Sequence, residues 1–280
     1  MQSKLVPYTL IVDCGSTKSN WAFMSREETL YLQARGFNPL NENLEYRQEV
    51  LKDWKAKLSH YSPNQIFYYG AGCINSTTNQ IVKDLLHDIF PNTKNISVKS
   101  DLNLVLEADP SQEPKIVGIL GTGSNTCVVE NDSVIDQIPS LGFLYGDFGS
   151  GYVLGKSIIH TVFNRTCPEI LRTKVLADQA LLAFRKFLFE HPDPKSFVAG
   201  LVVHLNACIE EKSVQELIDR HFEDFYKQLI VPYQRKLPII LYGGIAHYFE
   251  KHIKETGLKF GFPTVSCVKD PLESWIKNRL

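Results

Sequence analysis

The sequence predicts an α/β protein with mixed sheets flanked by helices, built from two related halves. Runs of β-prone residues alternate with helical patterns along the chain, which is the order typical of sheets covered by helices. A strand, a loop of Gly, Ser and Thr, and a second strand occupy residues 8–23, and the same succession recurs at 115–129. A chain of 280 residues, 44% of them hydrophobic, can form two domains of ordinary size.

The first half begins with a predicted β-hairpin. Its two apolar runs, at 8–12 and 20–23, are separated by small polar residues that suit a tight connection. Apolar residues that recur at three- and four-residue steps indicate helices farther along, and β-prone runs indicate short strands. The helices are expected over 45–58, 79–89 and 102–108, and the strands over 66–69 and 96–100.

The second half begins with another hairpin and is richer in helices. Its strands are expected at 115–120, 126–129 and 237–242, and its helices at 155–163, 173–189, 197–208, 214–229, 246–256 and 271–278. Gly257 is expected to end the helix before it, because glycine readily adopts the left-handed conformation that closes many helices. The boundary is expected at 109–114, which gives an N-terminal lobe of 1–113, completed by 270–280, and a C-terminal lobe of 114–269.

Charge and composition argue against several classes of protein. The net charge is −1 and no block of Lys or Arg stands out, so neither a nucleic acid nor an anionic membrane is expected as a partner. No apolar stretch approaches the roughly 20 residues that span a bilayer, and residues 1–10 lack the pattern of a secretory signal. The six cysteines are scattered without a CxxC pair, as is typical of thiols in a reducing compartment, so a cytoplasmic location is expected.

Three loops at predicted strand ends have the composition of phosphate-binding loops. They are Asp13-Cys14-Gly15-Ser16-Thr17, Gly121-Thr122-Gly123-Ser124-Asn125 and Gly243-Gly244. Tight loops of Gly, Ser and Thr can direct several backbone N–H groups at one phosphate without a lysine. The Walker pattern GxxxxGK[ST] is absent, and no GxGxxG follows a predicted strand, so the rival nucleotide-binding folds are disfavoured.

In order and spacing, these loops resemble the motifs of the actin/hexokinase/heat-shock ATPase superfamily. The first loop resembles the first phosphate motif, the second loop resembles the second, and 241–245 resembles the adenosine motif. Within the superfamily, the chain is most similar to the N-acetylglucosamine kinase-like branch of the BadF/BadG/BcrA/BcrD ATPase family, through 36–39, 121–125 and 141–151. The resemblance covers nearly the whole chain and implies a two-lobed actin/hexokinase-like (ribonuclease H-like) fold, ATP and Mg²⁺ as cofactors, and a homodimer.

The resemblance also implies roles for individual residues. Asp101, between a strand and a helix, is the implied catalytic base that accepts the proton of a sugar hydroxyl, although the position would also suit a helix N-cap. Asp13 would orient Mg²⁺ through water, or would only cap its own loop. The other implied contacts are Gly15, Ser16, Thr17, Lys18, Gly121, Thr122, Gly123 and Ser124 with the phosphates, Gly243 and Gly244 with adenosine, and Asn38, Thr122, Gly142 and Asp147 with the sugar.

The implied sugar loop departs from the family pattern at two positions. Phe148 follows Asp147 where a glutamate is usual, and Leu141 stands where the animal enzymes place a tryptophan. The first change removes a hydrogen-bond acceptor, and the second removes an aromatic surface on which a sugar can stack. Recognition of an N-acetyl group is therefore left open, and Asp147 could also serve only in an Asx turn.

The sequence thus predicts an ATP-dependent kinase that phosphorylates a hydroxyl of an amino sugar or related hexose, such as glucosamine or N-acetylglucosamine, with Mg²⁺. Two alternatives stay open. One is a sugar- or nucleotide-binding sensor without turnover, which the altered loop at 146–151 favours. The other is an activator ATPase that delivers electrons from an iron–sulfur cluster, for which Cys127, in a predicted strand, and Cys167 are poor ligands.

Overall fold

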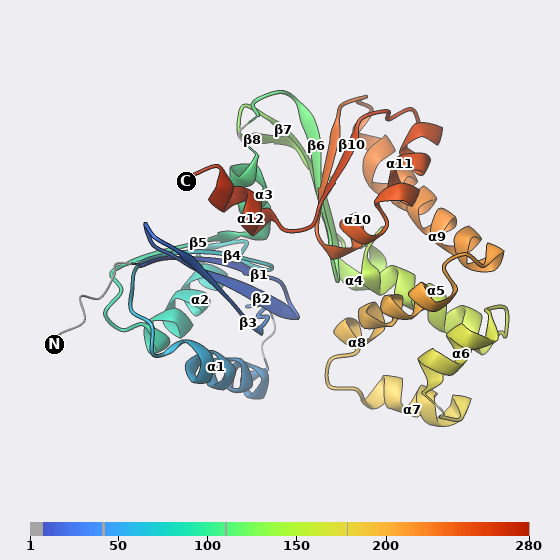
Figure 1. Ribbon diagram of the computed structural model, residues 1–280, viewed down its shortest axis with the longest axis horizontal. Helices are drawn as coiled ribbons and strands as arrows, with labels where there is room; N and C mark the ends of the chain where they lie inside the picture. Colours follow the sequence, from blue (N-terminus) through green and yellow to red (C-terminus); the bar gives the residue numbers. More distant parts are fainter. Residues whose placement is uncertain (1–7, 41–42, 110, 178, 280) are drawn as a thin grey trace. The chain divides into compact units, whose positions relative to one another are not determined.

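The computed structural model describes residues 8–40, 43–109, 111–177 and 179–279 (Figure 1). The chain divides into two compact units: unit 1 contains Met1–Pro110 and Pro271–Leu280, and unit 2 contains Ser111–Asp270. Each unit has a five-stranded mixed sheet flanked by helices, so the predicted α/β fold class is confirmed. Residues 1–7, for which no secretory signal is expected, lie outside the described part of the chain, as does Pro110 of the predicted lobe boundary.

The sheet of unit 1 has the strand order β3-β2-β1-β4-β5. β1 (Tyr8–Cys14), β2 (Lys18–Met24) and β3 (Thr29–Arg35) form an antiparallel meander, and β4 (Pro63–Gly70) and β5 (Asn95–Ser100) run parallel to β1. The pairing of β1 with β2 confirms the hairpin predicted at 8–23. Because β1, β4 and β5 are parallel, their carboxyl ends lie at one edge of the sheet.

Different helices cover the two faces of this sheet. On one face, α1 (Leu44–Leu58) and α2 (Ser76–Ile89) pack against Leu10 and Val12. On the other face, α3 (Asp101–Ala108) and α12 (Pro271–Lys277) pack against Ile11. Successive strand residues point to opposite faces, so the continuous apolar run of β1 is buried on both sides. α12 contacts α3, which returns the end of the chain to unit 1 (Figure 1).

The sheet of unit 2 has the strand order β10-β9-β6-β7-β8. β6 (Lys115–Leu120), β7 (Ser124–Glu130) and β8 (Ser133–Asp136) are antiparallel, and β9 (Ile239–Tyr242) and β10 (Val265–Val268) run parallel to β6. This is the connectivity of unit 1: a three-stranded meander is followed by two strands parallel to its first strand. The repeat predicted from the two strand–loop–strand segments therefore extends to the whole sheet.

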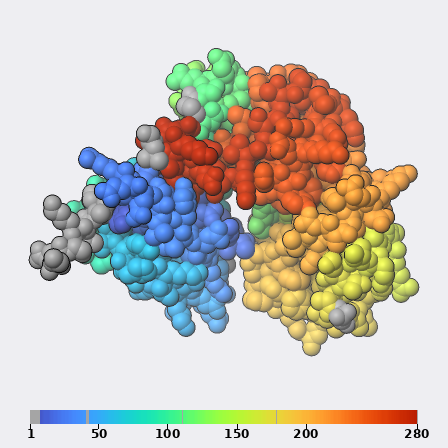
Figure 2. All heavy atoms as spheres, in the orientation of Figure 1, coloured from blue at the N-terminus to red at the C-terminus, as the bar shows by residue number. Residues whose placement is uncertain are grey.

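Most helices of unit 2 lie between β8 and β9 in the chain and form one packed region, yellow to orange in Figure 2. They are α4 (Gly142–Tyr145), α5 (Gly151–Phe163), α6 (Glu169–Leu176), α7 (Leu181–Glu190), α8 (Pro194–Gly200), the 3₁₀ helix η1 (Leu201–Cys208), α9 (Lys212–Phe225), the π-helix η2 (Tyr226–Ile230) and the 3₁₀ helix η3 (Val231–Tyr233). α10 (Gly244–Tyr248) and α11 (Glu250–Lys259) follow β9. In the described ranges, no helix is both long and apolar enough to cross a membrane.

Three predicted helices of unit 2 are interrupted in the structure. The single helix expected at 173–189 is wrong, because Ala177 adopts a left-handed φ of 48° and separates α6 from α7. The helix expected at 197–208 is divided into α8 and η1, and the one expected at 246–256 is interrupted at Phe249. Apolar periodicity continues across each interruption, so the side-chain pattern alone does not reveal where a helix ends or changes type.

The role predicted for Gly257 as a helix terminator is also wrong. Gly257 lies inside α11, which continues to Lys259. A Cβ at this position would lie 2.7 Å from the hydroxyl oxygen of Tyr226, so the glycine provides space for a close packing contact. The glycine that adopts a left-handed φ after this helix is Gly261, at 79°.

Candidate functional site

Two aspartates of unit 1 lie at the same edge of its sheet. Asp13 is the last residue but one of β1, and Asp101 follows β5 as the first residue of α3. Cys14 pairs with Gly70 of β4, and Gly70 pairs with Ser100 of β5, so the three parallel strands end level with one another. At about 4.8 Å between adjacent strands, the two aspartate backbones are roughly 10 Å apart. The predicted base and the predicted Mg²⁺-orienting residue therefore share one edge.

The carboxylates at this edge of the sheet affect the pKa of the buried thiol of Cys14. Burial is the main cause that raises its pKa to about 12, and the carboxylates of Asp13 and Asp101 add to the effect. Both carboxylates are thus close enough to the same sulfur to influence it electrostatically.

Asp101 itself has an altered acidity. Burial raises the pKa of its carboxyl above the ordinary 3.8, although Oδ1 accepts a hydrogen bond of 2.9 Å from Leu102 N. A raised pKa makes the carboxylate a stronger base, which suits the acceptance of a hydroxyl proton. The N-cap of α3 is Ser100, so the alternative prediction that Asp101 is the N-cap is wrong.

The loop between β1 and β2 is closed by its own backbone. Gly15 N donates to Lys18 O at 3.0 Å, and Gly15 O accepts from Phe37 N at 3.1 Å. Gly36 packs so closely against the loop that a Cβ there would collide with Gly15 O. Thr17 and Lys18 are exposed at the turn. The turn, and not the amide of Gly15, is therefore the part of this loop that faces solvent.

Asn38 joins this loop to the turn that follows β4. Its Nδ2 donates to Ser16 Oγ at 3.3 Å, and its Oδ1 accepts from Leu40 N at 3.0 Å. Its Oδ1 also lies against Gly72, which has a φ of 80° and where a Cβ would collide with the amide oxygen. The half-buried carboxamide therefore fixes the first phosphate loop, in addition to the sugar contact predicted for it.

In unit 2, three hydrogen bonds join the second phosphate loop to the segment that contains Asp147. They are Gly151 N to Gly121 O (2.8 Å), Tyr152 N to Thr122 O (3.3 Å) and Ser124 Oγ to Phe148 O (2.8 Å). Gly121 N donates to Gly123 O at 2.9 Å, so this loop is closed on itself as the loop of unit 1 is. The residues predicted to contact phosphate and sugar thus form one assembly in unit 2.

Asp147 is buried directly beside the second phosphate loop. Its side chain is 5% exposed, and its backbone has a left-handed φ of 55°. A Cβ on Gly123 would lie 2.7 Å from Asp147 Oδ2, so any side chain at that position would force the carboxylate to move. Lys195 Nζ lies 3.4 Å from the same oxygen and forms an ion pair that the sequence did not predict.

The predicted adenosine motif lies against the same loop. Gly243 has a φ of 113°, and a Cβ there would lie 2.5 Å from Leu120 O. Its N–H donates to Val268 O at 2.9 Å, which fixes the turn after β9. Gly244 begins α10, and a Cβ there would meet no other atom within 4 Å. The adenosine motif and the second phosphate loop are therefore in contact through Gly243, and Gly244 faces open space.

Gly142 lies at the start of α4, five residues before Asp147. It has a left-handed φ of 67°, and its N–H donates to Ser140 Oγ at 3.2 Å. Leu141, at the position of the family's tryptophan, is exposed. The turn carries two exposed aromatic residues, Phe143 and Tyr145, and the ring centroid of Phe143 lies 5.5 Å from that of Tyr152. The turn thus presents aromatic rings two and four residues after the position at which the family has its tryptophan.

Two residues that contact the segment around Asp147 were not predicted. His221 of α9 is buried, its ring hydrogen-bonds the backbone of Gly149, and burial lowers its pKa to about 4. Lys195 follows Pro194 in the first turn of α8, where the helix dipole disfavours a cation. That unfavourable position is a signal in the sequence that could have drawn attention to Lys195, whereas nothing local distinguishes His221.

The surroundings of Asp13 fit a Mg²⁺ ion that is also bound by phosphates. Within the described ranges, no three His, Cys, Asp or Glu residues are grouped so that they could hold a metal ion. Mg²⁺ beside a nucleotide is usually bound by one or two carboxylates, phosphate oxygens and water. Asp13, a half-buried carboxylate beside the first phosphate loop, would supply the one carboxylate that this arrangement needs.

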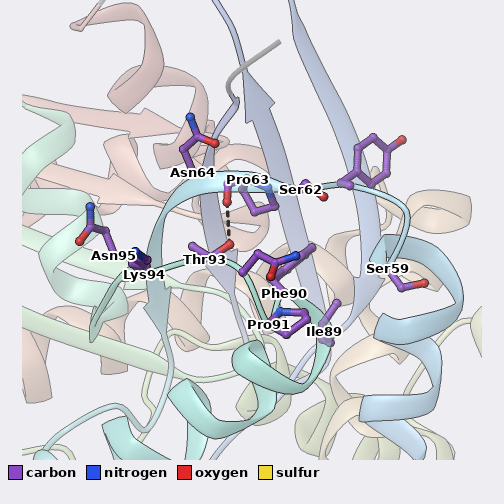
Figure 3. A pocket seen from close by; sticks show the side chains of 12 residues that line it. Ser59, Ser62, Pro63, Asn64, Ile89, Phe90, Pro91, Thr93, Lys94 and Asn95 are labelled. Atoms are coloured by element: carbon purple, nitrogen blue, oxygen red, sulfur yellow. Dashed lines mark hydrogen bonds between the residues drawn. The ribbon is translucent and has the colours of Figure 1, made fainter. Parts of the chain in front are cut away.

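The hollow in Figure 3 lies at the opposite edge of the unit 1 sheet. It has a volume of about 400 Å³ and lies by the amino ends of β4 and β5, where Thr93 Oγ1 donates to Pro63 O at 2.6 Å. Lys94 is the one charged residue among those that line it, all of which the structure describes. Because Asp13 and Asp101 lie at the carboxyl ends of β1 and β5, this hollow is separate from them.

The chain matches several solved structures along almost its full length, although no protein-family model and no curated protein matches it. A putative N-acetylglucosamine kinase from Porphyromonas gingivalis is 28% identical, with a TM-score of 0.82 over 96% of this chain and 97% of that chain. A putative N-acetylglucosamine kinase from Chromobacterium violaceum is 17% identical, with a TM-score of 0.69 over 97% and 98% of the two chains. A ROK family glucokinase from Streptomyces griseus, in complex with glucose and AMPPNP, is 13% identical, with a TM-score of 0.54 over 94% and 93%.

These similarities confirm the fold that the resemblance implied and the likeness to N-acetylglucosamine kinase-like proteins. They cover nearly all of each chain, and they include both the N-acetylglucosamine kinase-like proteins and the ROK family. The repeated sheet topology of units 1 and 2 agrees with them. The chain therefore has the actin/hexokinase-like ATPase fold, in the form found in the N-acetylglucosamine kinase-like proteins.

Proposed function

We propose that this chain is an ATP-dependent kinase of the BadF/BadG/BcrA/BcrD type that transfers the γ-phosphoryl group to a hydroxyl of an amino sugar or related hexose. The observation that carries the proposal is the position of Asp101, whose pKa is raised, on the same sheet edge as Asp13 and the first phosphate loop. The 28% identity to a putative N-acetylglucosamine kinase over almost the whole chain supports it.

Asp101 would act as the catalytic base. Its carboxylate would accept the proton of the attacking hydroxyl while the sugar oxygen bonds to the γ-phosphorus and the bond from phosphorus to the departing ADP oxygen breaks. Mg²⁺, held by Asp13 through water and by the phosphates, would neutralise the phosphate charge when bound. Phosphoryl transfer depends mostly on positioning, so one carboxylate that orients the nucleophile is sufficient.

The remaining contacts are divided between the two lobes. In this proposal, the lobe of 1–113 and 270–280 supplies the base, Asn38 as a sugar contact and Gly15 to Lys18 as phosphate contacts. The lobe of 114–269 supplies Gly121 to Ser124 for the phosphates, Gly243 and Gly244 for adenosine, and Thr122, Gly142 and Asp147 for the sugar. The burial of Asp147 beside Gly123 supports the second group, because it places a carboxylate acceptor next to a phosphate loop.

The test is a screen for phosphorylated sugar with glucosamine, N-acetylglucosamine, N-acetylmuramic acid, glucose and anhydro sugars. With the best substrate, Asp101→Asn should lower kcat by about 10²–10⁴-fold and leave ATP binding unchanged. Asp88→Asn, an exposed aspartate on α2, is the matched control and should keep wild-type kcat. Near-normal kcat in Asp101→Asn would remove Asp101 as the base.

Two features of the loop around Asp147 favour the sensor alternative. Lys195 already pairs with Asp147, and Phe148 replaces the family's glutamate, so the loop has fewer free acceptors than the family pattern. If the protein binds ATP but phosphorylates none of the sugars, the sensor alternative is supported and the kinase is rejected.

The cysteines do not support the activator ATPase. Burial raises the pKa of Cys127 to about 12 and also raises the pKa of Cys167, so neither is a thiolate ready to bind a cluster. All six cysteines are free thiols, which supports the proposal of a cytoplasmic location. The homodimer implied by the resemblance is likewise a proposal, and sedimentation velocity of the purified chain would test it.

A further inference from the structure

The ion pair of Asp147 and Lys195 places a hydrogen-bond acceptor and a donor side by side next to the second phosphate loop. Nζ lies 3.4 Å from Oδ2, and the side chains are 26% and 5% exposed. Lys195 Nζ is also 3.3 Å from where a Cβ of Gly123 would be, so both groups lie against the loop. The acceptor is therefore buried and fixed, whereas the donor is open to solvent on one side.

Packing of α8 fixes the position of Lys195. α8 crosses α5 so closely that a Cβ on Gly155 would collide with Val198 O. Asp193 caps the start of α8 by accepting a hydrogen bond of 3.0 Å from Ser196 N. A lysine in this first turn is disfavoured by the helix dipole, so its location is explained by what its ammonium contacts.

The surroundings of the pair suit a sugar ring. The ammonium of Lys195 lies 5.5 Å from the ring centroid of Phe143, which is 38% exposed. An aromatic face can pack against the C–H groups of a sugar while polar groups beside it bind the hydroxyls. A sugar hydroxyl both donates and accepts a hydrogen bond, whereas a carboxylate only accepts and an ammonium only donates.

We propose that Asp147 and Lys195 together recognise two adjacent hydroxyls of the acceptor sugar, Asp147 accepting from one and Lys195 donating to the oxygen of the next. This inference rests on the proposed function, in which Asp147 contacts the sugar. It makes Lys195 a specificity-determining residue, and it restricts the acceptor to sugars that keep two neighbouring ring hydroxyls free. Lys195 also holds the Asp147 carboxylate in place, since it bonds the oxygen that faces Gly123.

The test compares monodeoxy analogues of the sugar that the wild type phosphorylates best. Loss of a hydroxyl bonded by a charged group should raise the wild-type KM by about 10- to 100-fold, and we expect this at two adjacent positions. In Lys195→Met, the penalty for one of the two positions should disappear while the penalty for its neighbour persists. Asp147→Asn should show the reverse selectivity, and the KM for ATP should stay within about twofold of wild type in both.

Three further variants separate recognition from folding. Lys195→Arg keeps the donor and the charge, so it should retain most of the wild-type pattern of KM values across the analogues. Lys195→Gln removes the charge but keeps a donor, and it is used if Lys195→Met does not fold. Lys186→Met removes a lysine from an exposed ion pair with Glu190 in the same unit and should match wild type throughout. Thermal unfolding of each variant shows whether a change in KM accompanies a change in stability.

The outcomes distinguish this inference from the proposed function. If the wild type phosphorylates no sugar, the proposed function fails and the inference fails with it. If a sugar is phosphorylated but Lys195→Met and Lys195→Gln raise KM equally for the parent sugar and every analogue, Lys195 has only a structural role and this inference alone is overturned. The same holds if the wild type is sensitive to no adjacent pair of hydroxyls.

Discussion

Protonation of His221 should destabilise the protein in mild acid. Its ring is buried on α9 and hydrogen-bonds the backbone of Gly149, in the segment next to Asp147. Burial lowers its pKa from 6.5 to about 4, so the folded protein keeps the neutral ring over a range in which the unfolded chain binds a proton. The stability that depends on the neutral ring is complete above pH 6.5 and is lost as the pH falls toward 4. A pKa difference of this size corresponds to about 3 kcal/mol.

The assay is urea unfolding of wild type and His221→Gln at pH 7 and at pH 4. Glutamine can still donate a hydrogen bond to the backbone of Gly149 but does not titrate. The difference in unfolding free energy between the two proteins should therefore move by about 3 kcal/mol in favour of the variant between pH 7 and pH 4. The other titrating groups are common to both proteins. A difference in unfolding free energy that does not change with pH would therefore refute the claim that His221 is buried in its neutral form.

Three other perturbations follow from the structure. Gly123→Ala would place a Cβ 2.7 Å from Asp147 Oδ2, so steady-state kinetics should show a sugar KM raised at least about tenfold, and a wild-type KM would contradict the packing. Trp275→Ala removes a 3% exposed side chain that bonds Glu107 Oε2 at 3.2 Å, and should lower the free energy of unfolding in urea by about 3–5 kcal/mol; a loss below about 1 kcal/mol would count against the packing of α12 on unit 1. The raised pKa of Asp101 means that kcat/KM should fall on the acid side at a pH above the ordinary 3.8, and a fall centred at or below 3.8 would argue against this base.

The parts of the fold that the sequence predicts well are those with a strong local pattern. The two hairpins were predictable because apolar runs end abruptly at small polar loops, at Asp13 and at Gly121. α2 was predictable in type because its apolar residues recur at helical spacing, although its start was not, since the capping box of Asn75 and Thr78 lies before the apolar pattern begins. The spacing of apolar residues is a property of the local sequence, so it can be recognised without knowledge of the tertiary contacts.

The parts that were missed depend on tertiary packing or on very short segments. β8, at Ser133–Asp136, is exposed throughout and has no apolar alternation to mark it. The break at Ala177 requires a residue in the left-handed conformation, and no glycine stands there to indicate it. Gly257 was misinterpreted because its function is to leave room for Tyr226, which is distant in the sequence.

The residues of the candidate site can likewise be divided into those that the sequence predicts and those that depend on tertiary packing. The loops and Asp101 were predictable because strand ends and a known motif order place them, and their roles stay predictions until they are tested. The ion pair of Asp147 with Lys195 was not predictable, because it depends on how α8 packs against α5. The proximity of Lys195 to the exposed ring of Phe143 was not predictable either, because it joins two segments that are distant in the sequence.

The most direct test of the central claim is phosphorus NMR of the wild-type protein with ATP, Mg²⁺ and the sugar panel. The account predicts that ADP and one sugar phosphate appear in equal amounts, and that Asp101→Asn forms both at least about 100-fold more slowly. The formation of ADP with free inorganic phosphate and no sugar phosphate would contradict it.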